Sequence, residues 1–322
     1  DGGHGYIGVG KPWSWYIHND VRHGAEPKAW KVFSMSTDQV ADRLYGFGGL
    51  AAQNIIQKAH AFVATAPDGA EVGSRVSRFQ VMHLRRPNHG SFDVLIDGKQ
   101  VARVDSAGPK VEAAIESFRV PDGAHKLELV SEADLVRLLG VVMERDSAGI
   151  VVDSVGIGGV NSELLARGDR ALTLSTLAMR HHDLVLILTG ATEPDAPGQS
   201  TALKELVTRH REALPEAPFM ILSPPDLAGG TPKNPMPSVR IKQVEKYKLR
   251  TAEEEKAMYW DFRAAMGGEL SIVRFAEHKM AWNDFIHLTG PGGRYMGRRL
   301  AYALVRDFAR YLTKHPRAGC EK

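Results

Sequence analysis

The pattern of apolar residues changes near Arg145, and this change most constrains what the chain can fold into. Between residues 29 and 144 the pattern predicts short strands, at residues 30–35, 60–65, 78–84, 91–96, 101–105, 113–120 and 125–130. Several of them alternate apolar and polar residues, as half-buried strands do. Asp97-Gly98 is a two-residue hairpin signal between two of these strands, because glycine readily takes positive φ. This zone predicts an antiparallel β-sandwich.

After Arg145 strands alternate with helices. Residues 149–154, 184–189 and 219–222 fit buried strands, and residues 161–166, 171–180, 201–213, 251–266 and 295–314 fit helices. The run 184–189 is continuously apolar, as in parallel sheets covered on both faces. Three glutamates, at 253, 254 and 255, open the 251–266 segment, where the helix dipole favours negative charge. This zone predicts an α/β domain with an open, mostly parallel sheet.

Composition excludes several classes of protein. The 322 residues suffice for two domains, and the net charge of +3 comes without a Lys/Arg block of the kind that binds nucleic acid. No apolar run approaches the ~20 residues that span a bilayer, so we expect no membrane span. The single cysteine, Cys320, permits no intrachain disulfide and is a poor catalytic candidate.

The first motif that carries chemistry is Asp284-Phe-Ile-His287. An aspartate can accept a hydrogen bond from one imidazole nitrogen and so fix the tautomer in which the other nitrogen acts as a base. The spacing alone is not selective, since D-x-x-H also begins at Asp1, Asp20 and Asp122. The alternative interpretation is a loop before a helix with a structural histidine.

The residues around this motif resemble the last conserved block of the SGNH/GDSL hydrolases. The segment 282–289 reads Trp-Asn-Asp-Phe-Ile-His-Leu-Thr, and Gly-Pro-Gly-Gly and a long amphipathic helix follow it. The resemblance implies that His287 is the general base and that Asp284 orients it. Segment 151–160 is similar to the family's second block, which implies an oxyanion-binding amide at Gly159. Segment 190–193 is similar to the third block, with Thr192 where the family has Asn.

The family's first block, Gly-Asp-Ser, does not occur in these residues, so the resemblance implies a nucleophilic serine upstream of Asp1. The opening Asp-Gly-Gly-His-Gly-Tyr is similar to a subgroup with a carbohydrate-binding-type sandwich between the first and second blocks. Peptidoglycan O-acetylesterases are among its members. The implied organisation is a three-layer, flavodoxin-like α/β domain at residues 1–28 and 145–322, lacking its first strand and helix. Residues 29–144 would be a jelly-roll-like insert.

Three other segments of the sequence offer rival sites. Ser154 follows an expected buried strand, but a nucleophile elbow needs glycine where the chain has Val152. A dinucleotide-binding loop at residues 156–159 is rejected because Asn161 stands at the third glycine position. His181 and His182 are adjacent and no H-E-x-x-H occurs, so we expect neither a metal nor another cofactor.

The resemblance implies a bacterial serine esterase that removes O-acetyl groups from a cell-envelope glycan, in the periplasm or outside the cell. Its partner would be an acylated polysaccharide or peptidoglycan. Two alternatives stay open: an O-acetyltransferase, and an impaired scaffold that binds glycan or plays a structural role. Four aromatic residues could stack on sugar rings or pack in a core, namely Trp13, Trp15, Tyr16 and Trp30.

Overall fold

The structure is a computed structural model that describes residues 1–18, 20–37, 42–132, 134–194 and 198–315. Cys320 lies outside the described residues. The chain forms two compact units, each with its own apolar core. The first unit comprises Asp1–Asp183 and Thr208–Ala217, and the second comprises Leu184–Val207 and Pro218–Lys322.

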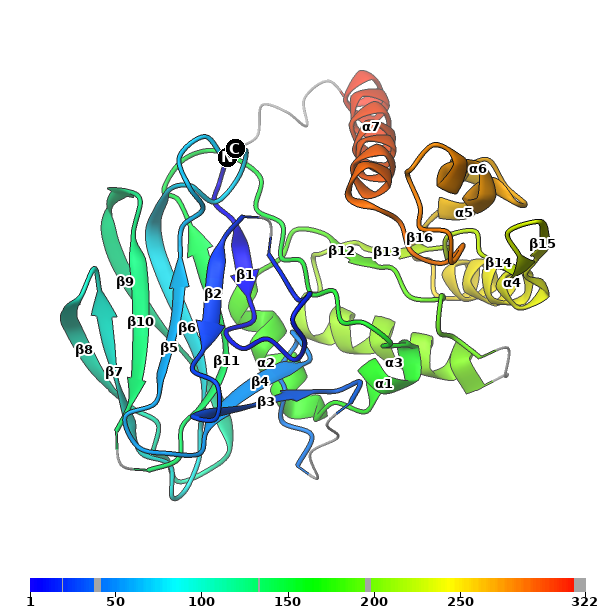
Figure 1. The fold of residues 1–322 in the computed structure, drawn as a ribbon. Coiled ribbons are helices and arrows are strands. Elements are labelled where there is room, and N and C mark those ends of the chain that lie inside the picture. Colours follow the sequence, from blue (N-terminus) through cyan, green and yellow to red (C-terminus); the bar gives the residue numbers. More distant parts are fainter. Residues whose placement is uncertain (19, 38–41, 133, 195–197, 316–322) are drawn as a thin grey trace. The chain divides into compact units, whose positions relative to one another are not determined.

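The first unit is built mainly from two antiparallel sheets (Figure 1). The six-stranded sheet has the order β3-β4-β11-β6-β9, with β1 paired to β11, and the five-stranded sheet has the order β2-β5-β10-β7-β8. The elements are β1 (Gly5–Ile7), β2 (Arg22–Ala25), β3 (Trp30–Ser34), β4 (Leu50–Asn54), β5 (His60–Ala64), β6 (Val76–Arg85), β7 (Ser91–Ile96), β8 (Lys99–Asp105), β9 (Glu112–Gly123), β10 (Lys126–Ser131), β11 (Arg137–Glu144), α1 (Ser162–Ala166) and α2 (Arg170–Arg180). One buried cluster contains Phe79 and Val141 of the first sheet with Phe92 and Leu127 of the second, so the sheets pack face to face.

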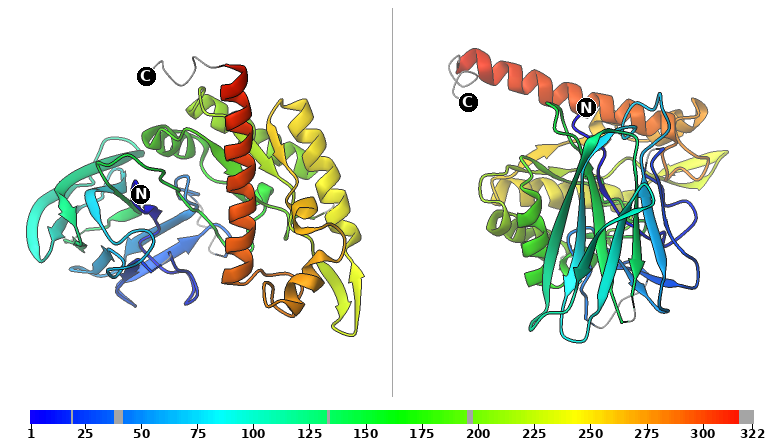
Figure 2. Two further views of the ribbon diagram at one scale, coloured as in Figure 1. Left: turned by 90° about the horizontal axis from the view of Figure 1, so that it is seen from above. Right: turned by 90° about the vertical axis from the view of Figure 1, so that its left-hand side faces the viewer.

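The second unit holds a small parallel sheet with helices around it. Its three strands pair in the order β12-β13-β16, and a separate antiparallel pair joins β14 to β15. The elements are β12 (Val185–Ile187), α3 (Gly198–Ala213, which ends in the first unit), β13 (Phe219–Leu222), β14 (Ala228–Thr231), β15 (Asn234–Pro237), α4 (Val239–Glu254), β16 (Met258–Trp260), α5 (Phe262–Met266), α6 (Ser271–Glu277) and α7 (Gly290–Lys314). The long helix α7, red in Figure 2, packs its first half on α5 and α6 through Met296 and Phe275. No helix in the described part of the chain is long and apolar enough to cross a membrane.

The expected three-layer, flavodoxin-like domain with a mostly parallel sheet is wrong. Among the described residues the sheets are mostly antiparallel, and only the pairs β12–β13 and β13–β16 are parallel. Residues 149–154, expected as a buried strand, form no strand, and Ile150 and Val152 are exposed. The run 184–189 is not covered on both faces, because the exposed fractions of Leu186 and Leu188 are 42% and 49%.

The helix expected over residues 251–266 is also wrong. α4 ends at Glu254, Lys256 takes a φ of +50°, and the strand β16 follows before α5 begins. The glutamates at 253–255 therefore close a helix instead of opening one. By contrast, the hairpin at Asp97-Gly98 is confirmed, since both residues have positive φ (51° and 77°) between paired β7 and β8. The domain boundaries implied by the family resemblance stay a prediction.

Candidate active site

Asp284 and His287 lie in the second unit, on the loop between α6 and α7. Nδ1 of His287 is 2.9 Å from Oδ2 of Asp284, and Oδ1 accepts the backbone N–H groups of Ile286 (2.9 Å) and His287 (3.1 Å). Partial burial disfavours the charged carboxylate, but these hydrogen bonds outweigh it and lower the pKa of Asp284. With Nδ1 donating to a carboxylate, Nε2 is the basic nitrogen. The imidazole is 71% exposed, and no residue in the described chain hydrogen-bonds Nε2.

The main chain holds this loop in one shape. Phe285 takes a φ of +56° and buries its ring in the core of the second unit. Its carbonyl accepts the N–H of Ala228 at 3.2 Å, and the Trp282 N–H donates to the His287 carbonyl at 2.8 Å. Asp284 and His287 therefore flank Phe285, whose buried ring fixes the loop to the core of the second unit.

Close packing explains one glycine of the Gly-rich segment 290–293 that follows the motif. Thr289 caps α7 by accepting the N–H of Gly292, and its hydroxyl donates to the Lys279 carbonyl at 2.7 Å. A Cβ on Gly292 would lie 1.9 Å from the Met280 carbonyl oxygen, so only glycine fits there. The pattern that suggested the family therefore forms a tight loop-to-helix junction.

Of the four D-x-x-H sequences, only Asp284–His287 has its two side chains hydrogen-bonded to each other within the described residues. His125 instead places Nδ1 2.6 Å from Asp97 and Nε2 2.8 Å from the Pro121 carbonyl. Both of its ring nitrogens are occupied, which excludes it as a base. The geometry thus separates motifs that spacing alone could not.

Thr192 is exposed and lies in a turn that follows β12 in the second unit. Arg240 of α4 holds this turn from one side: its guanidinium donates to the carbonyls of Gly190 (3.4 Å), Ala191 (2.8 Å) and Glu193 (2.6 Å). Three carbonyls of four consecutive residues are therefore bound by one side chain.

Lys248, two turns further along α4, holds the base of the same turn. Its side chain is fully buried, and Nζ donates to the carbonyl of Thr189 and, at 3.1 Å, to that of Leu222 at the end of β13. Burial lowers the pKa of this amine to about 7, although the neighbouring Glu193 carboxylate opposes the shift. The Lys248 amine is therefore hydrogen-bonded to the chain at the carboxyl ends of two neighbouring parallel strands, β12 and β13.

The segment that follows β13 connects the two candidate loops. Gly190 has a φ of +133°, and a Cβ there would lie 2.5 Å from Cβ of Pro224. A few residues later the N–H of Ala228 donates to the Phe285 carbonyl on the His287 loop. Both loops thus contact the chain that leaves the carboxyl end of β13, which is where open α/β sheets bind ligands.

The other predicted residues, Gly159 and Ser154, belong to the first unit. Gly159 is exposed with a φ of +76°, and a Cβ there would meet nothing within 4 Å. Ser154 is exposed, and among described residues its hydroxyl has no hydrogen bond to a histidine. The preceding carboxylate is buried and already engaged: Asp153 accepts from the Tyr6 N–H, Arg180 and His182 Nε2, the first and last at 2.8 Å.

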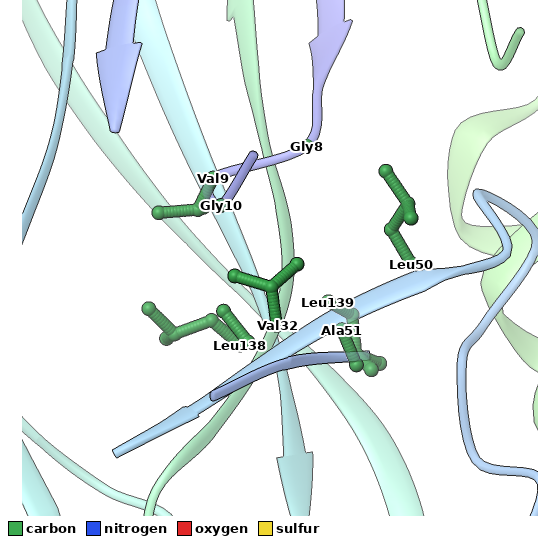
Figure 3. Close-up of a pocket in the computed structure, with 9 residues that line it drawn as sticks. Gly8, Val9, Gly10, Val32, Leu50, Ala51, Leu138 and Leu139 are labelled. Atoms are coloured by element: carbon green, nitrogen blue, oxygen red, sulfur yellow. The ribbon is translucent and has the colours of Figure 1, made fainter. Parts of the chain in front are cut away.

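Two further features of the first unit bear on ligand binding. Tyr16 and Trp30 are buried, whereas Trp15 is 65% exposed, with its ring centroid 4.6 Å from that of Trp13. The recess drawn in Figure 3 is lined only by glycine, alanine, valine and leucine, so it offers no group for ester chemistry. The described residues hold no cluster of three or more metal-ligating side chains.

Sequence reasoning missed Arg240 and Lys248 because it placed no helix over 239–254. A signal was present: Ile241, Val244 and Ala252 have the spacing of a buried helical stripe, and Lys248 falls within it. A lysine in such a stripe indicates a buried amine that needs acceptors.

No protein-family model and no curated protein matches the sequence. Solved structures do match. A peptidoglycan O-acetylesterase structure aligns over 97% of this chain and 83% of its own, with a TM-score of 0.78 and 22% identity. A lipase/acylhydrolase from Enterococcus faecalis aligns over 48% of this chain and 74% of its own, with a TM-score of 0.36 and 20% identity. The second likeness is too low to carry an argument.

The chain therefore shares the fold of a solved esterase structure. That structure is the peptidoglycan O-acetylesterase, and the likeness extends over nearly the whole of this chain. At this level of identity the likeness establishes the fold and leaves substrate and site roles to be tested.

Proposed function

We propose that this protein is a serine esterase that removes O-acetyl groups from a cell-envelope glycan. The observation that carries the proposal is the Asp284–His287 hydrogen bond on a rigid loop whose second ring nitrogen is open. His287 takes the proton of a serine hydroxyl as the oxygen attacks the acetyl carbon, then gives it to the leaving sugar oxygen. Asp284 orients the ring and stabilises the imidazolium. Water then releases the acetyl group from the serine.

The oxyanion that forms during attack needs hydrogen-bond donors. We assign this role to the Gly159 N–H and to Thr192, as the family resemblance suggests. The nucleophile is proposed to lie upstream of Asp1. Ser154 is the rival, and the absence of a histidine hydrogen bond among the described residues weakens it.

Support for a glycan substrate comes from two observations. The structure with a TM-score of 0.78 is a peptidoglycan O-acetylesterase. The exposed indole of Trp15, paired with Trp13, provides an apolar face of the kind on which sugar rings stack. An envelope glycan as substrate places the protein in the periplasm or outside the cell.

The test is acetate release by the full-length gene product, from 4-nitrophenyl acetate and from O-acetylated peptidoglycan. We expect His287→Ala to lower kcat at least about 10³-fold, since the members of a triad act as a unit. His278→Ala, an exposed histidine of the same unit, is the matched control and should keep the full rate. Ser154→Ala should also keep it. Unchanged turnover in His287→Ala would refute the proposal, and loss of turnover in Ser154→Ala would move the nucleophile to Ser154.

A second candidate is a scaffold that binds glycan without hydrolysing it. Thr192 favours this candidate, because a threonine hydroxyl is shorter than the amide it replaces and is differently placed. An unmodified protein that binds acetylated glycan but releases no acetate would support it. Transfer of the acetyl group to a sugar hydroxyl, detected by mass analysis of the products, would indicate a transferase instead.

A further inference from the structure

The turn after β12 has several of its backbone carbonyls bound by one guanidinium. Arg240 binds the carbonyls of Gly190 and Ala191, and the structure contains no cis peptide bond in its described part. In a trans peptide the N–H points opposite to the C=O. The N–H of Ala191, which shares a peptide with the Gly190 carbonyl, therefore points away from the guanidinium.

This N–H is available to a ligand. Ala191 is half-buried, and its N–H donates to no group among the described residues. It lies beyond the carboxyl end of β12, in the turn that contacts Pro224, and the same segment is bonded at Ala228 to the His287 loop. An amide donor in this position lies at the carboxyl edge of the sheet, where the proposed reaction takes place.

The Arg240 guanidinium strengthens the donor as well as orienting it. A peptide whose carbonyl binds a cation is polarised, and its N–H becomes a stronger donor in a chain of hydrogen bonds. Lys248 binds the Thr189 carbonyl one peptide earlier and fixes the start of the turn on β13. The arrangement holds the N–H donor in place before the reaction begins. Donors that are fixed in this way lower the activation barrier by stabilising the oxyanion.

We propose that the Ala191 backbone N–H donates a hydrogen bond to the oxyanion, and that Arg240 is the positioning residue that aims it. The inference rests on the proposed function. As the bond from serine oxygen to the acetyl carbon forms, the carbonyl π electrons move onto oxygen, and the Ala191 N–H stabilises that charge. When the bond to the sugar oxygen breaks, the electrons return and His287 protonates the leaving oxygen. The backbone thus supplies a donor where the family's asparagine is replaced by Thr192.

The direct test removes the donor and keeps the side chain, while the Gly190 carbonyl stays in place as a weaker acceptor for Arg240. In the full-length gene product, Ala191 is replaced by lactic acid through nonsense suppression, which exchanges the N–H for an oxygen and keeps the side chain. We expect kcat on 4-nitrophenyl acetate to fall about 10²-fold with KM changed less than twofold, as for loss of an oxyanion donor.

The test of Arg240 uses substitution and rescue. Arg240→Ala should lower kcat about 10-fold or more at constant KM, Arg240→Lys should retain an intermediate rate, and millimolar guanidinium should restore part of the loss in Arg240→Ala. Lys242→Ala is the matched control, because Lys242 is an exposed cation on the same helix that pairs with Glu269. It should keep both constants.

The outcomes separate this inference from the proposed function. If His287→Ala abolishes turnover while the lactic acid variant keeps its kcat within twofold, the Ala191 assignment is wrong and the esterase stands. If the unmodified protein is inactive, or His287→Ala is as active as the unmodified protein, the proposed function itself fails. A loss in Arg240→Ala that guanidinium does not restore, accompanied by a lowered melting temperature, would reduce Arg240 to a structural role.

Discussion

Lys248 should make the stability of the second unit rise with pH. Its amine is fully buried against two backbone carbonyls, and burial lowers its pKa to about 7 in the folded protein. In the unfolded chain the pKa returns to 10.5. Between these values the unfolded state binds a proton that the folded state has released. Stability therefore increases as pH rises through this window.

The size of the effect follows from the two pKa values. Each pH unit inside the window contributes at most about 1.4 kcal/mol. Near pH 7 the folded amine is half protonated, so the rise from pH 7 to pH 9 is about 2 kcal/mol. Lys248→Met removes the titration and fills the same space. It removes the hydrogen bonds from Lys248 Nζ to the Thr189 and Leu222 carbonyls, but that cost does not change with pH.

The assay is urea unfolding at pH 7, 8 and 9, followed by circular dichroism at 222 nm. This signal reports chiefly on the second unit, which contains the long helices α4 and α7. The free energy of unfolding of the unmodified protein minus that of Lys248→Met should rise by about 2 kcal/mol across the series. A difference that stays flat would mean that the buried amine keeps its proton, and the reasoning would be wrong.

Two further predictions concern the first unit. Asp153→Asn should lower the free energy of unfolding of the first unit by about 3 kcal/mol. The reason is that the amide cannot accept all the hydrogen bonds from Tyr6, Arg180 and His182, and it leaves the Arg180 charge less compensated. Urea unfolding checks this prediction, and a loss below about 1 kcal/mol would contradict it. Trp15→Ala should weaken binding of an acetylated oligosaccharide about tenfold without changing turnover of 4-nitrophenyl acetate, because one stacking contact contributes roughly 1.5 kcal/mol. Calorimetry measures the binding, and Tyr302→Ala, at an equally exposed aromatic residue of α7, is the control. Equal losses of affinity in the two variants would rule out a specific contact between Trp15 and the sugar.

Local signals predicted individual elements well. Asp97-Gly98 gave the hairpin because two consecutive positive φ angles suit that dipeptide. Asp169 caps α2, and this helix begins one residue before its expected start at 171. Thr289 caps α7, which begins at Gly290, five residues before its expected start at 295. These elements depend on contacts between neighbours in sequence.

The failures depend on contacts that sequence does not display. The mostly parallel sheet was inferred from apolar runs at 149–154 and 184–189, but only the second contains a strand, of three residues. Whether such a run is covered depends on packing partners far along the chain. The hydrogen bonds from Arg240 to the turn could not be predicted either, since 47 residues separate Arg240 from Glu193.

The candidate base could be predicted from the residues around it, although the D-x-x-H spacing alone left four sequences equivalent. Within the described residues, only Asp284 and His287 among these four pairs are hydrogen-bonded to each other. Motif context pointed to Asp284 and His287, and their roles in catalysis stay a prediction.

β12 is hydrogen-bonded on one side only within the described chain, and its own Leu186 and the following Leu188 are exposed. A strand with a free edge can pair with another extended segment, because its outer N–H groups can donate backbone hydrogen bonds and its outer carbonyls can accept them. The first strand that the proposed function places upstream of Asp1 would be such a segment. The free edge of β12 is directly followed by the turn that carries Ala191, so a strand paired there would end beside the proposed oxyanion donor.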